Sequence, residues 1–135
     1  MRYAIEDVGL LIKRAQHRHH REIDVSLATI GVSVVQWSAL REIDRNPGAS
    51  MHRLAELSFN SDQAFGTLMA RLLRIGLIER LQGPGRVAHH RLTPNGTDLL
   101  RKGRRLVTKV LALSFASLDE EERDALGALL AKLLA

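Results

Sequence analysis

The sequence predicts a mainly α-helical fold with one small β-hairpin. Apolar residues recur every three or four positions over most of the 135 residues, which is typical of amphipathic helices. One stretch breaks this pattern, because two short runs, 77–82 and 87–92, flank the turn Gly83-Pro84-Gly85. With 45% hydrophobic residues, a chain of this length can bury one sizeable core, so we expect a single domain over residues 1–135.

The first two helices are predicted by apolar spacing and by a start signal. Residues 3–29 carry an apolar residue every three or four positions and are expected to form one long helix. Ser33 and Gln36 have the spacing of a capping box, which begins a second helix. We expect that helix to run to about Arg45, where an Asn-Pro-Gly break follows.

Two shorter helices follow. Ser50 can cap a helix that runs through Leu57. After a brief polar turn, Ser61 or Asn60 can cap a fourth helix, which is expected to close near Gly76.

The C-terminal third predicts two more helices after the hairpin. Thr93 and Pro94 are a favourable cap and first position for a long fifth helix. Asp119 and Glu122 repeat the capping-box spacing, and the carboxylates between them favour the positive end of a helix dipole. We therefore expect a sixth, leucine-rich helix to the end of the chain.

The order of these elements indicates a winged helix-turn-helix. The third and fourth helices are joined by a tight turn and are followed at once by the hairpin at 77–92, which takes the place of a wing. An arginine at the tip of such a wing, Arg86, can reach a phosphate or the narrow minor groove of DNA.

The charge of the chain agrees with a polyanionic partner. There are 20 Lys and Arg against 15 Asp and Glu, a net charge of +5, and the isoelectric point is about 10.4. Residues 71–109 hold ten basic and two acidic side chains. Part of this excess is the run at 101–105, "RKGRR", whose charges we expect to spread around a helix as a solvated face. Double-stranded DNA is the first candidate partner.

Several other classes of protein or site are not supported by the sequence. The chain has no cysteine, so it has neither disulfides nor thiolate metal ligands. His17, His19 and His20 share one helix, but adjacent residues on a helix point in different directions, and we expect neither a metal nor a cofactor. No phosphate-binding loop or catalytic triad motif is present, so we expect a protein that is not an enzyme. With no apolar run of membrane-spanning length, we expect no membrane association and a cytoplasmic location.

The sequence also resembles a known family over nearly its whole length. The motifs that carry the resemblance are Leu54-Ala55, Arg71-Leu72, residues 76–80 ("GLIER") and the "LTPNG" run at 92–96, which are similar to the core signature of MarR (multiple antibiotic resistance regulator) transcription factors. The resemblance implies a homodimer that binds a pseudo-palindromic operator, usually as a repressor, and that often releases DNA on binding a small-molecule effector. It further implies that residues 1–30 and 95–135 form the dimerisation region, and residues 33–93 the DNA-binding lobe.

The chain departs from the family pattern in the wing and the recognition helix. The usual acid before the wing arginine is absent, since Pro84-Gly85 precedes Arg86, and the wing is short. A position of the recognition helix that is often basic is Thr67, and Asp62 adds a negative charge near the start of that helix.

The candidate DNA-contacting residues fall into two groups. Gln63 and Thr67 lie opposite the apolar face of the fourth helix and are predicted to read base edges. Ser61 and Asp62 lie beside them; either can contact DNA, although we favour a capping role for Asp62. A second set is predicted to contact phosphates and comprises Ser50, His52, Arg53, Arg71, Arg74 and Arg86, with a plain exposed face as the equal alternative for His52 and Arg53.

The resemblance places an effector pocket between the first, second and fifth helices and the DNA-binding lobe. His19, Trp37 and Leu40 are the residues expected to line it, although a tryptophan is more often simply core, and His19 is equally expected to pack in the dimer interface. The competing function is a protein-interaction module with the same fold and weak or no specific DNA binding.

Overall fold

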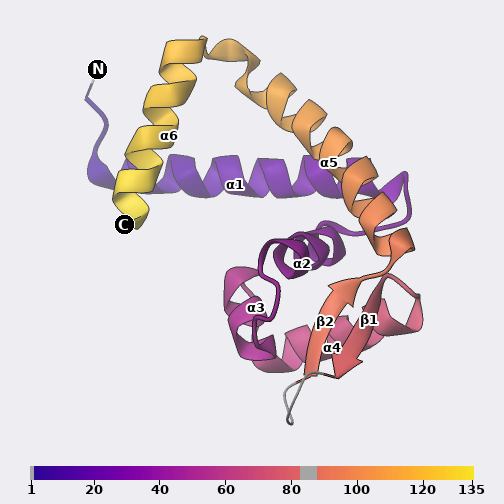
Figure 1. Cartoon of the computed structure of the whole chain (residues 1–135). Helices are drawn as coiled ribbons and strands as arrows, with labels where there is room; N and C mark the ends of the chain where they lie inside the picture. The colour runs from indigo at the N-terminus through magenta and orange to yellow at the C-terminus, as the bar shows by residue number, and fades with distance from the viewer. Residues whose placement is uncertain (1, 83–87) are drawn as a thin grey trace.

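The predicted order of elements is confirmed by the computed structural model, which describes residues 2–82 and 88–135 (Figure 1). The elements, in chain order, are α1 (Ile5–Ala28), α2 (Val34–Arg45), α3 (Met51–Leu57), α4 (Asp62–Arg74), β1 (Ile78–Gln82), β2 (Ala88–Leu92), α5 (Pro94–Ser114), a short 3-10 turn η1 (Phe115–Ser117) and α6 (Glu120–Leu134).

The predicted capping residues begin four of the helices. Ser33 and Asp119 each form a complete capping box, in which the third residue of the helix bonds back to the cap. Ser61, rather than Asn60, caps α4 by accepting a hydrogen bond from the backbone of Ala64 at 3.1 Å. The turn η1 between α5 and α6 was not predicted, because nothing in the local sequence stops the fifth helix before Leu118.

The hairpin is a two-stranded antiparallel sheet. Its register pairs Ile78 with Leu92 at the base and Arg80 with His90 further along. Ile78 is 2% exposed and anchors the base of the sheet in the core, while Arg80 and Gln82 are exposed. The hairpin therefore projects from the core as a wing.

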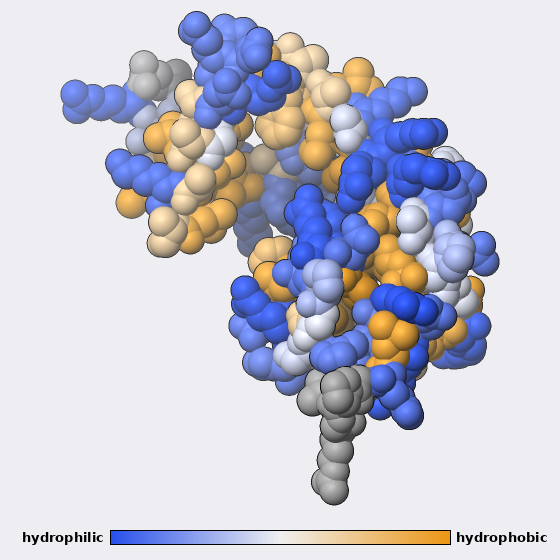
Figure 2. Space-filling view, viewed as in Figure 1, coloured by the Kyte–Doolittle hydropathy of each residue, from blue (hydrophilic) through white to orange (hydrophobic). Residues whose placement is uncertain are grey.

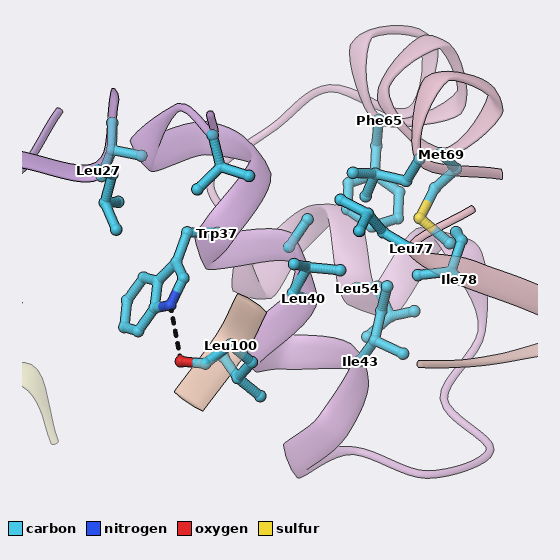
Figure 3. Close-up of a cluster of buried hydrophobic side chains, with 14 of the residues drawn as sticks. Leu27, Trp37, Leu40, Ile43, Leu54, Phe65, Met69, Leu77, Ile78 and Leu100 are labelled. Atoms are coloured by element: carbon cyan, nitrogen blue, oxygen red, sulfur yellow. Dashed lines mark hydrogen bonds between the residues drawn. The ribbon is translucent and has the colours of Figure 1, made fainter. Parts of the chain in front are cut away.

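The core lies between α2, α4, the base of the hairpin and the first half of α5 (Figure 3). Phe65, Met69 and Leu72 of α4 are almost fully buried, as is Leu40 of α2. Trp37 is 4% exposed, and its indole Nε1 donates a hydrogen bond to the carbonyl oxygen of Leu100 at 3.2 Å. This bond joins α2 to α5, although 63 residues separate the two partners.

A tight junction holds the start of α5 against the start of the hairpin. The backbone N–H of Thr93 donates to the carbonyl of Leu77 at 3.1 Å, and its hydroxyl donates to the carbonyl of Gly76 at 2.6 Å. A Cβ atom at Gly96 would lie 1.9 Å from the Leu77 oxygen. Only glycine permits this approach, which explains the glycine of the "LTPNG" run.

The remaining helices extend away from this lobe. Figure 1 shows α1 crossing above the lobe, α5 rising from the base of the wing across α1, and α6 returning from the far end of α5 towards the start of α1. Among the helices of residues 2–82 and 88–135, none has the length and hydropathy required to span a membrane.

Candidate nucleic-acid interface and apolar cavity

The turn between α3 and α4 holds these two helices in a helix-turn-helix. The backbone N–H of Asn60 donates to the carbonyl of Ala55 at 2.9 Å, and its side-chain amide donates to the carbonyl of Ser58 at 3.0 Å. Phe59 between them adopts φ = 60°, a left-handed conformation that is uncommon for a non-glycine residue, and its side chain is 94% exposed. The turn thus presents a large aromatic side chain that sequence reasoning did not single out.

The two faces of α4 are separated as predicted. Phe65, Met69 and Leu72 pack into the core, so the opposite face of the helix carries Gln63 and Thr67 outward. The hydroxyl of Thr67 donates to the carbonyl of Gln63 at 3.2 Å, which leaves its oxygen lone pairs and its methyl group available. These exposed groups are suited to base edges in a major groove. Their role stays a prediction.

Asp62 is engaged by a histidine of the neighbouring helix. One oxygen of its carboxylate lies 2.9 Å from Nδ1 of His52, and Nε2 of the same ring lies 2.9 Å from Oε1 of Glu56. The hydrogen bond to Asp62, followed by the charges of Asp62 and Glu56, raises the pKa of His52 above its ordinary value of 6.5. The capping role favoured for Asp62 belongs to Ser61, whereas the Asp62 carboxylate ties α4 to α3.

The other predicted contacts of α3 and α4 lie on the surface. Ser50 uses its hydroxyl to accept from the backbone N–H of Arg53 at 3.1 Å, as a helix cap does. The guanidinium of Arg53 lies 3.8 Å from Glu56. Arg71 and Arg74 are exposed in the last turn of α4, and within the described part of the chain neither has a carboxylate within 4.0 Å. Both remain available for phosphates.

The strands of the wing carry further basic side chains. Arg91 forms an ion pair with Glu79 directly across the sheet. His90 faces Arg80, and burial, the charge of Arg80 and the charge of His89 together lower the pKa of His90 below 6.5. Arg86, the predicted wing-tip contact, lies outside the described residues, and its role stays a prediction.

A large cavity of about 1000 Å³ lies between the long helices and the DNA-binding lobe. Its apolar wall includes Val8, Leu11 and Ile12 of α1 together with Leu126 and Leu130 of α6. The floor is formed by one side of α2 and by the turn Ser58–Asn60. The cavity therefore touches both the leucine-rich helices and the helix-turn-helix.

The cavity contains a small set of polar groups, including His19 and Arg41. His19 hydrogen-bonds through Nε2 to the hydroxyl of Ser114 at 2.6 Å and packs edge-on against Phe115, with ring centres 5.4 Å apart. The guanidinium of Arg41 lies 5.2 Å from the centre of the Trp37 ring and 3.2 Å from the Glu42 carboxylate. A cation in an apolar cavity can hold the carboxylate of a small ligand.

Two residues expected to line the pocket do not do so. Trp37 and Leu40 are 4% and 0% exposed and lie on the core side of α2. The face of α2 that is turned towards the cavity carries Val35, Ser38 and Arg41 instead. The apolar character of Trp37 and Leu40 alone could not distinguish a cavity wall from a core, because both are apolar; only the docking of α5 on α2 decides between them.

Comparisons with known proteins agree with this geometry. A model of the MarR family matches residues 30–86. The fold is similar to that of the MarR family protein Rv2887 of Mycobacterium tuberculosis in complex with p-aminosalicylic acid, at a TM-score of 0.81 and 24% identity over 94% of this chain and 98% of that one. A mutant of MarR from E. coli complexed with operator DNA has a TM-score of 0.85 and 22% identity, covering 96% of this chain and 94% of that one.

A probable transcriptional regulator from Pseudomonas aeruginosa has a TM-score of 0.79 and 25% identity, covering 93% of this chain and 96% of that one. No curated protein sequence matches the chain.

Proposed function

The chain belongs to the MarR family, and from this premise we propose that it is a dimeric, sequence-specific double-stranded DNA-binding regulator of transcription. The observation that carries the proposal is the outward face of α4, where Gln63 and Thr67 stand exposed at the start of a helix held by its partner helix α3. The N-terminal residues of such a helix are those that reach base edges. We propose repression as its action, with release by a small molecule.

The long helices provide the surface for a homodimer. No residue of α6 is buried within the single chain, and Leu129, Leu133 and Leu134 are at least 65% exposed. Figure 2 shows these hydrophobic side chains gathered over α6 and the adjoining part of α1. Exposed apolar surface of this extent marks an interaction site, and a second copy of the chain supplies a matching surface by two-fold symmetry.

Dimerisation has a direct consequence for DNA recognition. A two-fold axis through the long helices would place the two α4 helices on one side of the dimer, where they can enter successive major grooves about 34 Å apart. The operator is then pseudo-palindromic. Arg53, Arg71 and Arg74 would hold the phosphates that flank the bases read by Gln63 and Thr67.

The cavity is the proposed effector site. It touches the Ser58–Asn60 turn on one side and α6 on the other, so a ligand inside it acts on both the recognition lobe and the dimer helices. Arg41 favours a small aromatic carboxylate, the chemical class of the salicylic acid found with Rv2887. A ligand that shifts the lobe relative to α6 changes the spacing of the two α4 helices and weakens DNA binding.

The proposal is tested by the binding of the full-length protein to the DNA upstream of its own coding region. Fluorescence anisotropy is measured for this duplex and for a scrambled duplex of equal length, at several salt concentrations. We expect tighter binding to the upstream duplex and a steep loss of affinity with salt, because bound phosphates release counterions. Equal and weak binding to both duplexes would contradict specific regulation at this site and favour the protein-interaction module.

A further inference from the structure

The outer side of α5 carries a row of cations that the DNA contacts above do not use. Arg101, Arg104, Arg105 and Lys109, together called the α5 basic face, line one shallow groove along the helix. All four are exposed, and the first half of α5 is covered by hydrophilic side chains in Figure 2. The expectation that these charges spread around the helix is therefore wrong.

The packing of α5 explains why the cations share one side. Gly103 is buried against the indole of Trp37, and Leu100 and Val107 are buried one turn before and after it. This contact fixes the rotation of the helix about its axis. Because the buried residues occupy one side, residues 101, 104, 105 and 109 are turned to the other.

The charge of the α5 basic face is poorly compensated. Asp98 pairs with Arg101 and, at 2.9 Å, with Lys102. In residues 2–82 and 88–135 no carboxylate lies within 4.0 Å of Arg104, Arg105 or Lys109. Like charges four residues apart destabilise a helix, as do Arg101 with Arg105 and Arg105 with Lys109. An anionic partner relieves that repulsion.

The composition and spacing of the face indicate the kind of anion. Arg101, Arg105 and Lys109 follow one another at about 6 Å along the helix, so the row spans about 12 Å. One strand of duplex DNA presents a phosphate every 3.4 Å or so along its axis, so this row faces about three or four phosphates. Arginine prevails over lysine in the face, and its planar fork matches a phosphate. The six residues that line the groove include no aromatic side chain on which single-stranded bases would stack.

We propose that the α5 basic face is a second, sequence-independent binding surface for the phosphate backbone of duplex DNA. It begins nine residues after the end of β2 and lies outside the helix-turn-helix, so it holds DNA other than the base pairs that α4 reads. Its contribution to affinity is electrostatic and the same for every sequence.

The test compares two triple variants of equal charge in the full-length protein. Arg104→Gln/Arg105→Gln/Lys109→Gln removes three cations of the face, and Lys13→Gln/Arg14→Gln/Arg21→Gln removes three exposed cations of α1. Circular dichroism and light scattering first establish that both variants keep the fold and mass of the wild type. Anisotropy with a labelled random-sequence duplex of about 40 base pairs is then measured at several salt concentrations.

We expect the face variant to bind the random duplex with a log–log salt slope that is shallower by about 2.7, from three lost phosphate contacts. The α1 variant should keep most of the wild-type slope. Equal losses in both variants would reduce the effect to net charge, and an unchanged slope in the face variant would assign the face to another partner, such as an acidic protein. Either result overturns the proposal.

The outcome is separable from that of the proposed regulatory function. If the face variant retains the wild-type preference for the upstream duplex over a scrambled one, specificity lies with α4 as proposed. If no preference exists even in the wild type while the slope still changes, the face binds DNA and the regulatory proposal fails.

Discussion

Gly103 of α5 lies directly against the indole of Trp37, so that a Cβ atom at position 103 would come within 2.3 Å of the indole Nε1. The same indole nitrogen donates to the carbonyl of Leu100, one turn earlier in α5. This pair of contacts sets how closely α5 approaches α2. It also determines which side of α5 is buried and which faces outward.

The first prediction concerns this contact. Gly103→Ala should lower the free energy of unfolding by about 1–2 kcal/mol, because forcing a methyl group into a packed interface costs more than the better helix propensity of alanine returns. Leu27, at 3.1 Å from the same Cβ position, restricts relief by movement. Urea denaturation measures the change.

Gly66→Ala in α4 is the matched control for this prediction. Its Cβ atom would meet nothing within 4 Å, so the variant should be as stable as the wild type or more stable by up to about 1 kcal/mol. A Gly103→Ala protein that is as stable as Gly66→Ala would contradict the close packing.

The second prediction separates base reading from phosphate binding on α4. Gln63→Ala should reduce the preference for the upstream duplex over a scrambled one, by about 1–3 kcal/mol at the base it reads, with little change in salt slope. Arg74→Gln should weaken binding to both duplexes alike and make the salt slope shallower by about 0.9. Anisotropy on both duplexes measures this; identical behaviour of the two variants would argue against the assigned division of roles.

The third prediction follows from the cluster of His52, Asp62 and Glu56. The pKa of His52 is raised, so the protonated ring is favoured in the folded protein. The stability that it contributes is fully present below pH 6.5 and is lost as the pH rises through the folded-state pKa. His52→Asn should therefore lower the Tm at pH 5.5 and have little effect at pH 8.5.

A histidine-detected NMR titration provides the direct measurement. The resonance of His52 should titrate above pH 6.5 and that of His90 below it, since burial and Arg80 lower the pKa of His90. Asp62→Asn should move the titration of His52 downward. A midpoint for His52 that does not respond to Asp62→Asn would exclude the proposed partner.

The fourth prediction concerns the cavity and uses salicylate as the probe. Calorimetry should detect salicylate binding, and Arg41→Gln should weaken it by about 10- to 100-fold, the value of one lost charged hydrogen bond. Phenol, which has the ring without the carboxylate, should bind the wild type and the variant equally. Salicylate that binds both proteins with the same affinity would show that Arg41 does not hold the carboxylate.

Several elements could be predicted because their causes are local. Ser33 with Gln36, Thr93 with Pro94, and Asp119 with Glu122 each form a helix start from residues no more than three positions apart. The outward placement of Gln63 and Thr67 follows from the position of Phe65 within the same helix. In these places the sequence spacing is itself the geometry.

Other features depended on how distant segments dock. The pairing of His52 with Asp62 required the turn that brings α3 against α4, and the contact of His19 with Ser114 joins residues 95 positions apart. The core position of Trp37 and the single-sided charge of α5 both arise from the approach at Gly103. Periodicity alone assigned Trp37 to the pocket and spread the arginines around the helix, because it records the positions of side chains around an axis without stating which side meets a neighbour.

The sequence by itself thus determined the helices, the hairpin and the outward residues of α4, since hydrogen bonds and apolar spacing within a few residues specify them. The tertiary structure alone decided the composition of the cavity, the partners of His52 and the common direction of the α5 cations. These depend on the rotation and closeness of packed helices, which are set by contacts between residues far apart in the chain.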